Sequence, residues 1–326
     1  MTIGLSQVIA SNGKRTSTPV IDGMCHYARE FDRLPINATK VNKSRRRRSG
    51  GANRTIITDV SLMPSRMHQM LGDIRSDMVT GRQQDAEEYL GCILNGLHEE
   101  MLGLTKATGN GADVEAAEVG SVAGGFGRTP IADIFGGLLR SRIHRDGDRA
   151  TDNFEPFFTL QLDIRRARTV RESLETLVAK HSLEGLVSSR TNRVVEAWQQ
   201  VTLDELPVIL VLHLKCFDFG YGGCRKITRA LEYPLELSID GNLLSTNAPD
   251  DAEKRGDGTS YRVFTTGREA GRGHYLSDAF HSTYGSWISY DDTSVRPVQQ
   301  DDALKPQGDR VPYLLFYRHS DTVKRK

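Results

Sequence analysis

Two groups of polar residues near the end of the chain have the types and spacing of a proton-transfer pair. His274 lies in a glycine-rich segment, and Asp291 lies 17 positions later, with Asp292 directly after it. If the two segments form a β-hairpin, an imidazole and a carboxylate meet across the strand pair, and the carboxylate fixes the tautomer of the ring. This arrangement predicts a general base and the group that orients it. A purely structural histidine–aspartate pair has the same spacing, so the spacing alone leaves both interpretations open.

The elements that must position this pair indicate an α+β fold. Apolar residues at helical spacing predict helices from Thr18 to Phe31, from Asp85 to Met101 and from Val170 to Lys180. After Pro130, apolar-rich or alternating segments predict strands over residues 156–164, 207–217, 231–239, 261–266, 274–280 and 311–318. Because the helices come first and the strands later, the order argues for an α+β domain and against repeated βαβ units.

The composition narrows the classes of protein. A hydrophobic fraction of 38% predicts a sizeable core and excludes a fibrous or wholly disordered chain. The 43 Lys+Arg and 42 Asp+Glu residues leave a net charge of +1, which does not favour nucleic acid as a partner. The longest apolar run, residues 206–214, is too short for a membrane span, which needs about 20 residues. Four cysteines without a C-x-x-C pair predict a reducing compartment and no zinc ribbon, so we expect no metal and no cofactor.

Two segments are expected to be insertions, near residues 43–54 and 107–128. The first contains the run Lys43–Arg48, with five basic residues among six, and the second is rich in glycine, alanine and glutamate. The basic run favours a solvated loop over a nuclear-localisation signal or a phosphate contact, which remain the alternatives.

Four boxes resemble those of the ubiquitin-specific protease family, in the family's order. They are GRQQDAEEYL (residues 81–90), LVLHLKCF (210–217), GHY with WISYDD (273–275 and 287–292) and YLLFY (313–317). The amino-acid sequence of the first box, together with residues 16–22 upstream, is most similar to the branch of ubiquitin carboxyl-terminal hydrolase 10. The resemblance covers residues 16–318. Residues 1–15 are left as a non-matching segment and residues 319–326 as a basic tail.

The resemblance implies a papain-like fold of thumb, fingers and palm, and cleavage after the C-terminal glycine of ubiquitin by a thiolate. His274 would be the general base, Asp291 its orienting carboxylate and Asp292 an assisting neighbour. The ubiquitin-binding residues carried over from the family are Gln84, Asp85, Glu88, Phe217 and Tyr275. The two acids would face the basic tail, and the two aromatic rings would line a channel for its glycines. Asp85 also suits a helix N-cap. The implied partners are ubiquitin and ubiquitinated proteins, in the cytoplasm and also the nucleus.

The nucleophile box of this family, "GNTCYLNA", has no counterpart in the chain. Residues 1–15 contain no cysteine, so an incomplete N-terminal thumb is expected. Cys25 falls within a predicted helix, Cys92 beside a buried stripe, Cys216 in a strand and Cys224 in a glycine-rich turn, none of which suits an activated thiolate. We therefore expect no hydrolysis by the chain as written.

Three interpretations remain open at this point. The chain is part of a deubiquitinase that removes ubiquitin from protein conjugates, and its nucleophile lies upstream. Alternatively, it is a catalytically inactive, ubiquitin-binding pseudoenzyme or scaffold. A third interpretation, outside the family, is a β-rich binding module in which the histidine and aspartate meet by accident.

Overall fold

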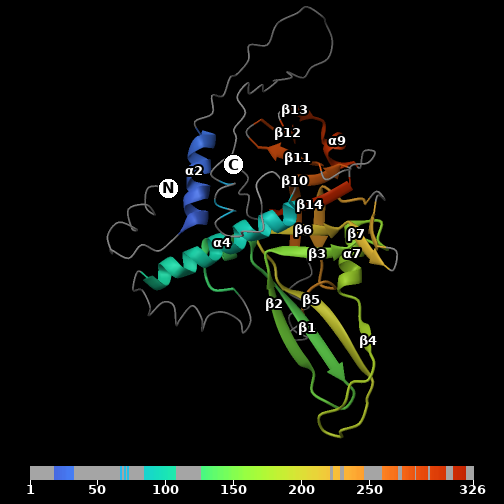
Figure 1. The fold of residues 1–326 in the computed structure, drawn as a ribbon. Coiled ribbons are helices and arrows are strands. Elements are labelled where there is room, and N and C mark those ends of the chain that lie inside the picture. The colour runs from blue at the N-terminus through green and yellow to red at the C-terminus, as the bar shows by residue number, and fades with distance from the viewer. Residues whose placement is uncertain are drawn as a thin grey trace, which may run out of the picture.

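The computed structural model describes residues 18–32, 84–107, 126–220, 223–227, 231–245, 259–270, 274–282, 284–292, 294–305 and 311–320, with Met67, Met70 and Gly72 (Figure 1). The expected insertion at residues 43–54 lies outside this part of the chain. So do residues 1–15, residues 321–326 and most of the second expected insertion.

An eight-stranded sheet, here called the large sheet, forms the centre of the molecule. Its strands lie in the order β13-β12-β11-β10-β14-β6-β3, and β9 pairs with β10 off this path. Their bounds are β3 Thr159–Asp163, β6 Ile209–Lys215, β9 Glu236–Ile239, β10 Thr259–Ala270, β11 His274–His281, β12 Ser286–Asp291, β13 Ser294–Val298 and β14 Val311–His319. Only β3 and β6 pair in parallel among these neighbours. Their apolar runs are buried on both faces, as in Leu210–Leu212, which is wholly buried.

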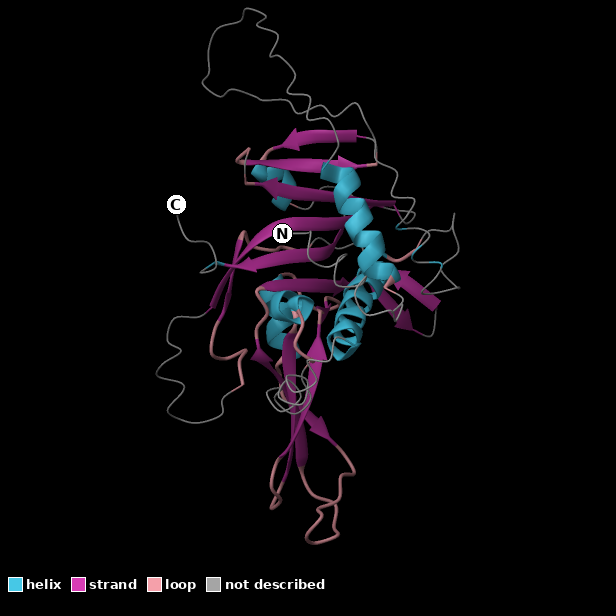
Figure 2. Cartoon of the chain, turned by 90° about the vertical axis from the view of Figure 1, so that its left-hand side faces the viewer, coloured by secondary structure: helices cyan, strands magenta, loops and turns pink. Residues whose placement is uncertain are grey.

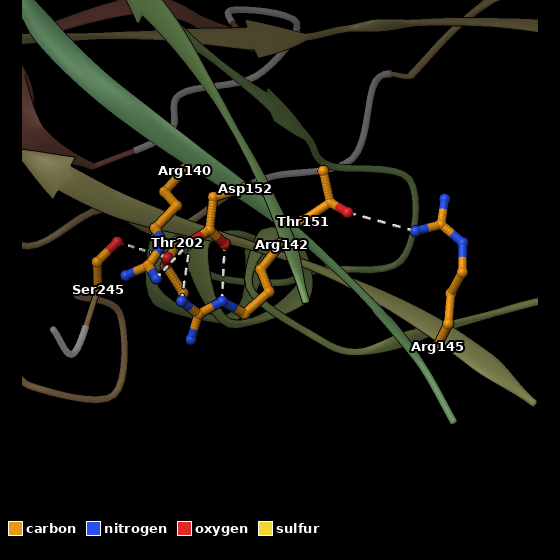
Figure 3. Close-up of polar contacts among 7 residues, drawn as sticks. All are labelled: Arg140, Arg142, Arg145, Thr151, Asp152, Thr202 and Ser245. Carbon is orange, nitrogen blue, oxygen red and sulfur yellow. Dashed lines mark hydrogen bonds and ion pairs between the residues drawn. The ribbon is translucent and has the colours of Figure 1, made fainter. Parts of the chain in front are cut away.

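A four-stranded sheet, here called the small sheet, extends away from the large one (Figure 1). Its strands are β2 Thr151–Phe157, β1 Gly137–Arg145, β5 Ala197–Glu205 and β4 His181–Leu183, in that order. Polar bonds support the β1–β2 pairing: the Asp152 carboxylate accepts from Arg140 at 2.7 Å and from Arg142 at 2.7 and 2.8 Å (Figure 3). Arg140 is only 6% exposed, so a buried arginine side chain supports this strand pair of the small sheet.

The helices whose bounds the structure gives are α2 Pro19–Asp32, α4 Ala86–Ala107, α6 Pro130–Phe135, α7 Val170–Leu177 and α9 Gln300–Leu304. α4 lies beside the large sheet and meets α2 (Figures 1 and 2). The Glu100 carboxylate of α4 accepts from the backbone amides of Val20 and Ile21, both at 2.9 Å. These amides are among the donors that the first turn of a helix leaves unpaired, so α4 caps α2. None of the described helices is long and apolar enough to cross a membrane.

Apolar side chains form two cores. The main core lies around the large sheet and includes Leu160, Leu212 and Leu315. The second core joins α2 to α4 and consists of Val20, Ile21, Met67, Met70, Ile93 and Leu97. The order of elements confirms the predicted α+β class.

Three predicted elements differ from the structure. Residues 156–164 form two strands, because the chain passes from the small sheet to the large one at Phe158, which stacks on Phe126 at 4.0 Å. In the segment 231–239 only β9 is a regular strand, since Pro234 has no N–H for a ladder. Cys224 lies in β8 (Gly223–Lys226), opposite Phe219 of β7 (Phe217–Gly220), and not in a turn.

Candidate active site

His274 and Asp291 meet at the end of a β-hairpin, as their spacing predicts. β11 and β12 pair in antiparallel register, with Ser277 opposite Tyr290, and Gly285 lies in the connecting turn at φ +63°. His274 Nε2 lies 2.6 Å from Asp291 Oδ1. The two side chains are 39% and 37% exposed, so the pair is open to a reacting group.

The bond to Asp291 decides which nitrogen of His274 is the base. With an ionised carboxylate at 2.6 Å, Nε2 is the nitrogen that donates its hydrogen, and Nδ1 has the free lone pair. Asp292 Oδ2 lies 3.9 Å from Nδ1, beyond hydrogen-bond distance. Asp292 has a left-handed backbone (φ +49°) and a side chain that is 79% exposed, so solvent screens its effect on the imidazolium.

The same three residues are near enough to share a metal ion, because one ligand atom of each lies within 4.8 Å of the others. A bound ion would have to replace the direct bond between His274 and Asp291, which already gives both groups a charge-assisted partner. The arrangement therefore suits proton transfer better than metal binding.

Asp85 caps α4 and also joins it to the large sheet. Its Oδ1 accepts from the backbone amides of Glu87 at 2.9 Å and Glu88 at 3.1 Å, which confirms the predicted N-cap. Its Oδ2 accepts from the hydroxyl of Tyr313, and from that of Tyr275 at 3.5 Å. Burial first, and then the bond to Asp85, raises the pKa of Tyr313, so this phenol remains a donor.

Sequence reasoning missed a second set of contacts at the start of α4. Glu87 Oε1 accepts from the Thr159 hydroxyl at 2.8 Å, and Oε2 lies 3.8 Å from His213 Nδ1. The His213 ring meets the Tyr313 ring edge-on at 5.0 Å. Burial lowers the pKa of His213, against the smaller opposing effect of Glu87. Glu87 lies in the box of residues 81–90 and His213 in the box of residues 210–217, but nothing in the sequence indicates that these two boxes touch.

The predicted ubiquitin-binding residues fall in two places. Gln84, Asp85 and Glu88 lie at the beginning of α4 and are all half-buried. Tyr275 follows His274 on β11 and meets Asp85, so the structure brings the acidic box and the histidine box together. Phe217 is the first residue of β7.

The described thiols lie in packed surroundings. Cys216 is fully buried, and its Sγ lies 3.4 Å from the carbonyl of Pro312. Cys25 and Cys92 are half-buried against the second core. Of the ionisable side chains that the structure describes, Asp291 and Asp292 are the ones paired with His274. The packed surroundings of Cys25, Cys92 and Cys216 therefore suit structural cysteines better than a nucleophile.

Comparison with known proteins agrees with the resemblance of the four boxes. Residues 17–317 match the family described as ubiquitin carboxyl-terminal hydrolase. The chain belongs to this family. Ubiquitin carboxyl-terminal hydrolase 10 of Rattus norvegicus is 37% identical over an aligned length of 349 positions, gaps included, and the match covers 94% of this chain and 43% of the rat protein. The chain thus spans less than half the length of the curated relatives it matches first. The predicted resemblance to this branch of the hydrolase family is confirmed.

Solved structures confirm the predicted papain-like fold of the ubiquitin-specific proteases. The SAGA Ubp8/Sgf11/Sus1/Sgf73 DUB module bound to ubiquitin aldehyde matches with a TM-score of 0.68 and 22% identity, covering 97% of this chain and 63% of that chain. A SAGA DUB module bound to monoubiquitin matches with a TM-score of 0.61 and 25% identity, covering 78% of this chain and 52% of that one.

Proposed function

We propose that this hydrolase-family chain acts in protein deubiquitination, by binding ubiquitin and by supplying the base of a thiol-protease site. The observation that supports this most strongly is the 2.6 Å bond between His274 and Asp291, at the histidine box of the family. Two structural neighbours bound to ubiquitin or ubiquitin aldehyde support ubiquitin as the partner.

The chemistry assigns each group one task. His274 Nδ1 takes the proton of a thiol, and the resulting thiolate attacks the carbonyl carbon of the last glycine of ubiquitin. Asp291 stabilises the imidazolium, which returns its proton to the leaving amine as the amide bond breaks. Water then cleaves the thioester, with His274 again as the base, and releases free ubiquitin and the thiol.

The four cysteines do not supply that thiol in our proposal. Cys216 is buried, Cys25 and Cys92 pack against the second core, and Cys224 lies in β8. By itself, the 326-residue chain binds ubiquitin without cleaving it, and hydrolysis needs a thiolate from outside these residues. The positions of the three described thiols equally favour a second candidate function, a ubiquitin-binding pseudoenzyme or scaffold.

The residues assigned to the ubiquitin tail are Gln84 and Glu88 of the acidic box, with Tyr275 and Phe217 at the channel. Glu88 provides a carboxylate for the basic residues of the tail, a contact that strengthens as salt falls. Asp85, which the sequence also predicts to face the tail, has both of its oxygens bonded within the chain.

The test uses the purified chain and two forms of ubiquitin. Calorimetry with ubiquitin is expected to show binding, and a ubiquitin probe with a C-terminal electrophile is expected to leave all four cysteines unlabelled. A ubiquitin adduct that forms with the chain and is lost in His274→Ala, but not in the control His26→Ala on α2, would disprove the proposal about the thiol. No measurable binding to ubiquitin would disprove the function itself.

The two candidate functions separate in a second experiment. The chain is produced together with the reading frame upstream of Met1 and tested for release of a fluorogenic amine from the C-terminus of ubiquitin. Release that Asp291→Asn reduces would favour the deubiquitinase. Unchanged binding without release would favour the pseudoenzyme.

A further inference from the structure

We propose that the loop between β3 and α7, residues 164–168, binds an acidic segment of a partner protein, with Arg166 as the residue that pairs with the incoming carboxylate. This β3–α7 loop follows the strand at one end of the large sheet, whereas His274 lies on β11, near the other end. Binding at the loop therefore needs neither ubiquitin nor proton transfer at His274.

A cavity lies beside the β3–α7 loop. β3 and α7 are in contact, and residues of both, with residues of the loop, line the cavity (Figure 1). Its volume is about 530 Å³, and its lining residues are Asp163, Arg165, Arg166, Ala167 and Thr176. Pockets for drug-sized ligands measure about 300–1,000 Å³, so this one has room for a side chain and the neighbouring backbone of a peptide.

Buried residues fix the loop and leave its two arginines outside. Ile164 and Ala167 are only 1% and 4% exposed. Arg165 and Arg166, which lie between them, are both exposed. The buried neighbours hold the backbone, so the positions from which the two guanidinium groups extend are set in the free chain. Such preorganisation lowers the entropy that binding costs.

The end of the loop is held by backbone and side-chain bonds. The carbonyl of Arg168 accepts from the amide of Glu232 at 2.9 Å. The hydroxyl oxygen of Thr169 accepts from the amide of Glu172 at 3.1 Å and thereby caps α7. The first turn of α7 is thus satisfied within the chain, and a ligand of the cavity has to bind side chains instead.

Asp163, the acid in the cavity wall, is already neutralised by Arg165. Nε of Arg165 donates to the Asp163 carboxylate at 2.9 and 3.0 Å, and Nη2 donates to it at 2.6 Å. The amide of Arg165 donates to the same carboxylate at 2.9 Å. The side-chain bonds of Arg165, the largest effect, hold the pKa of Asp163 below its ordinary value. Asp163 therefore remains the ionised partner of Arg165 and does not need Arg166.

The charge of Arg166 is not compensated in the same way. Among the residues that the structure describes, none forms an ion pair or a hydrogen bond with the Arg166 side chain. Lys215 lies opposite Asp163 in the β3–β6 register and adds another positive charge on this side of the sheet. A guanidinium at the wall of a cavity matches the two oxygens of a carboxylate, so these charges favour an acidic ligand.

Thr176 favours a peptide over an inorganic anion. Its hydroxyl hydrogen is donated to the carbonyl of Glu172 at 2.8 Å, so its oxygen is left as an acceptor. Sulfate offers acceptors only, whereas a peptide also has backbone N–H donors. An acidic peptide supplies both a carboxylate for Arg166 and an N–H for Thr176.

The experiment uses the full chain and a fluorescein-labelled peptide that alternates glutamate with glycine and has blocked termini. Fluorescence anisotropy measures the affinity at low and at physiological salt. The same peptide with glutamine in place of glutamate is the ligand control. Arg166→Gln is compared with Arg296→Gln, which makes the same change of net charge at an exposed arginine of β13, at the other end of the large sheet.

The glutamate peptide is expected to bind with a Kd below about 1 mM at low salt, and more weakly at physiological salt. Arg166→Gln should weaken binding by about fivefold, the upper end for an exposed ion pair, and Arg296→Gln by less than about twofold. Thr176→Val should weaken binding by about threefold through the loss of one hydrogen bond. Because Arg166 is exposed, we expect Arg166→Gln to keep the melting temperature of the unmodified chain.

NMR of the unmodified chain checks where the peptide binds, since the amide signals of Arg166, Ala167 and Thr176 should shift during the titration. The proposal is overturned if the glutamine peptide binds equally well, if Arg166→Gln and Arg296→Gln have the same effect, or if none of these signals shifts. Displacement of the peptide by equimolar sulfate would also contradict it, as would the absence of measurable binding. Neither result would change the outcome of the separate ubiquitin-binding measurement.

Discussion

The buried ion pair between Arg268 and Asp278 allows a quantitative test of how the large sheet is held together next to the candidate site. Arg268 is 2% exposed and Asp278 is 3% exposed, and their closest atoms lie 3.2 Å apart. Arg268 Nη2 also donates to the carbonyl of Ala303 and, at 3.1 Å, to that of Asp302 in α9. Arg268→Met would remove all of these bonds while keeping most of the side-chain volume.

We expect Arg268→Met to lower the free energy of unfolding by about 3–5 kcal/mol, because it leaves Asp278 buried without its charge partner. The Ala303 carbonyl contributes little to this loss, since the Tyr233 hydroxyl still donates to it at 2.9 Å. The double variant Arg268→Met with Asp278→Leu removes the unpaired charge as well. It is therefore expected to be more stable than Arg268→Met by at least about 1 kcal/mol.

Urea unfolding followed by tryptophan fluorescence measures the effect, because Trp287 on β12 is only 3% exposed. The control is Arg262→Met, because Arg262 lies on β10 like Arg268. Arg262 pairs with Glu236 at 3.5 Å, and their side chains are 53% and 61% exposed, so its loss changes stability by less than about 1 kcal/mol. The reasoning is refuted if Arg268→Met matches this control, or if the double variant is less stable than the single one.

Three further predictions concern the cores and helices. Burial lowers the pKa of His98 below its ordinary value of 6.5, and its Nδ1 lies 2.7 Å from the Thr129 hydroxyl oxygen, which accepts the amide hydrogen of Ala132. The unfolded chain therefore binds the proton more readily, so the melting temperature is expected to fall as pH drops below about 6.5, and less steeply in His98→Gln. Glu100→Gln replaces a charged acceptor of two amides in the first turn of α2, and should speed hydrogen exchange there at least tenfold by NMR, a result that unchanged exchange would contradict. Iodoacetamide should label Cys25 in the native chain and Cys216 only after unfolding, as mass spectrometry of the digested chain would show; native labelling of Cys216 would contradict its full burial.

Elements with one apolar face could be predicted from the sequence. The helix of the acidic box begins where Asp85 predicts, because a cap and a regular apolar stripe are local signals. The β11–β12 hairpin follows from the spacing of His274 and Asp291. In both cases the information lies within about twenty residues of chain.

The small sheet could not be predicted in the same way. β1 contains Arg140 and Arg142, which both bond to Asp152. Arg140 is buried, but the hydropathy of an arginine in the sequence indicates an exposed position, so the strand has no apolar pattern there. β5 was missed for a related reason: most of its residues are only half-buried, so its pattern lacks a clear apolar face. The break between β2 and β3 at Phe158 could not be predicted from the sequence, because the chain is extended on both sides of it.

Of the candidate site, the residue types and the pairing of His274 with Asp291 could be predicted, but the connections between the boxes could not. The bonds of Asp85 to Tyr275 and Tyr313 span 190 and 228 positions, and each depends on the register of a different strand. The sequence therefore indicates an acidic box and a histidine box, whereas only the fold shows that a carboxylate of one box accepts hydrogen bonds from tyrosines of β11 and β14.

The position of α4 gives these connections a mechanical consequence. Ala86 and Leu90, in its first turns, pack against the main core, and Ile93 and Leu97, further along, belong to the second core with α2. One continuous helix thus links the two cores. Through this helix, the core that packs against α2 is connected to Asp85 and to its contact with Tyr275, the residue next to His274. In the function that we propose, ubiquitin bound near α4 and the base His274 would lie on either side of the Asp85–Tyr275 contact, whereas the hairpin alone sets the bond between His274 and Asp291.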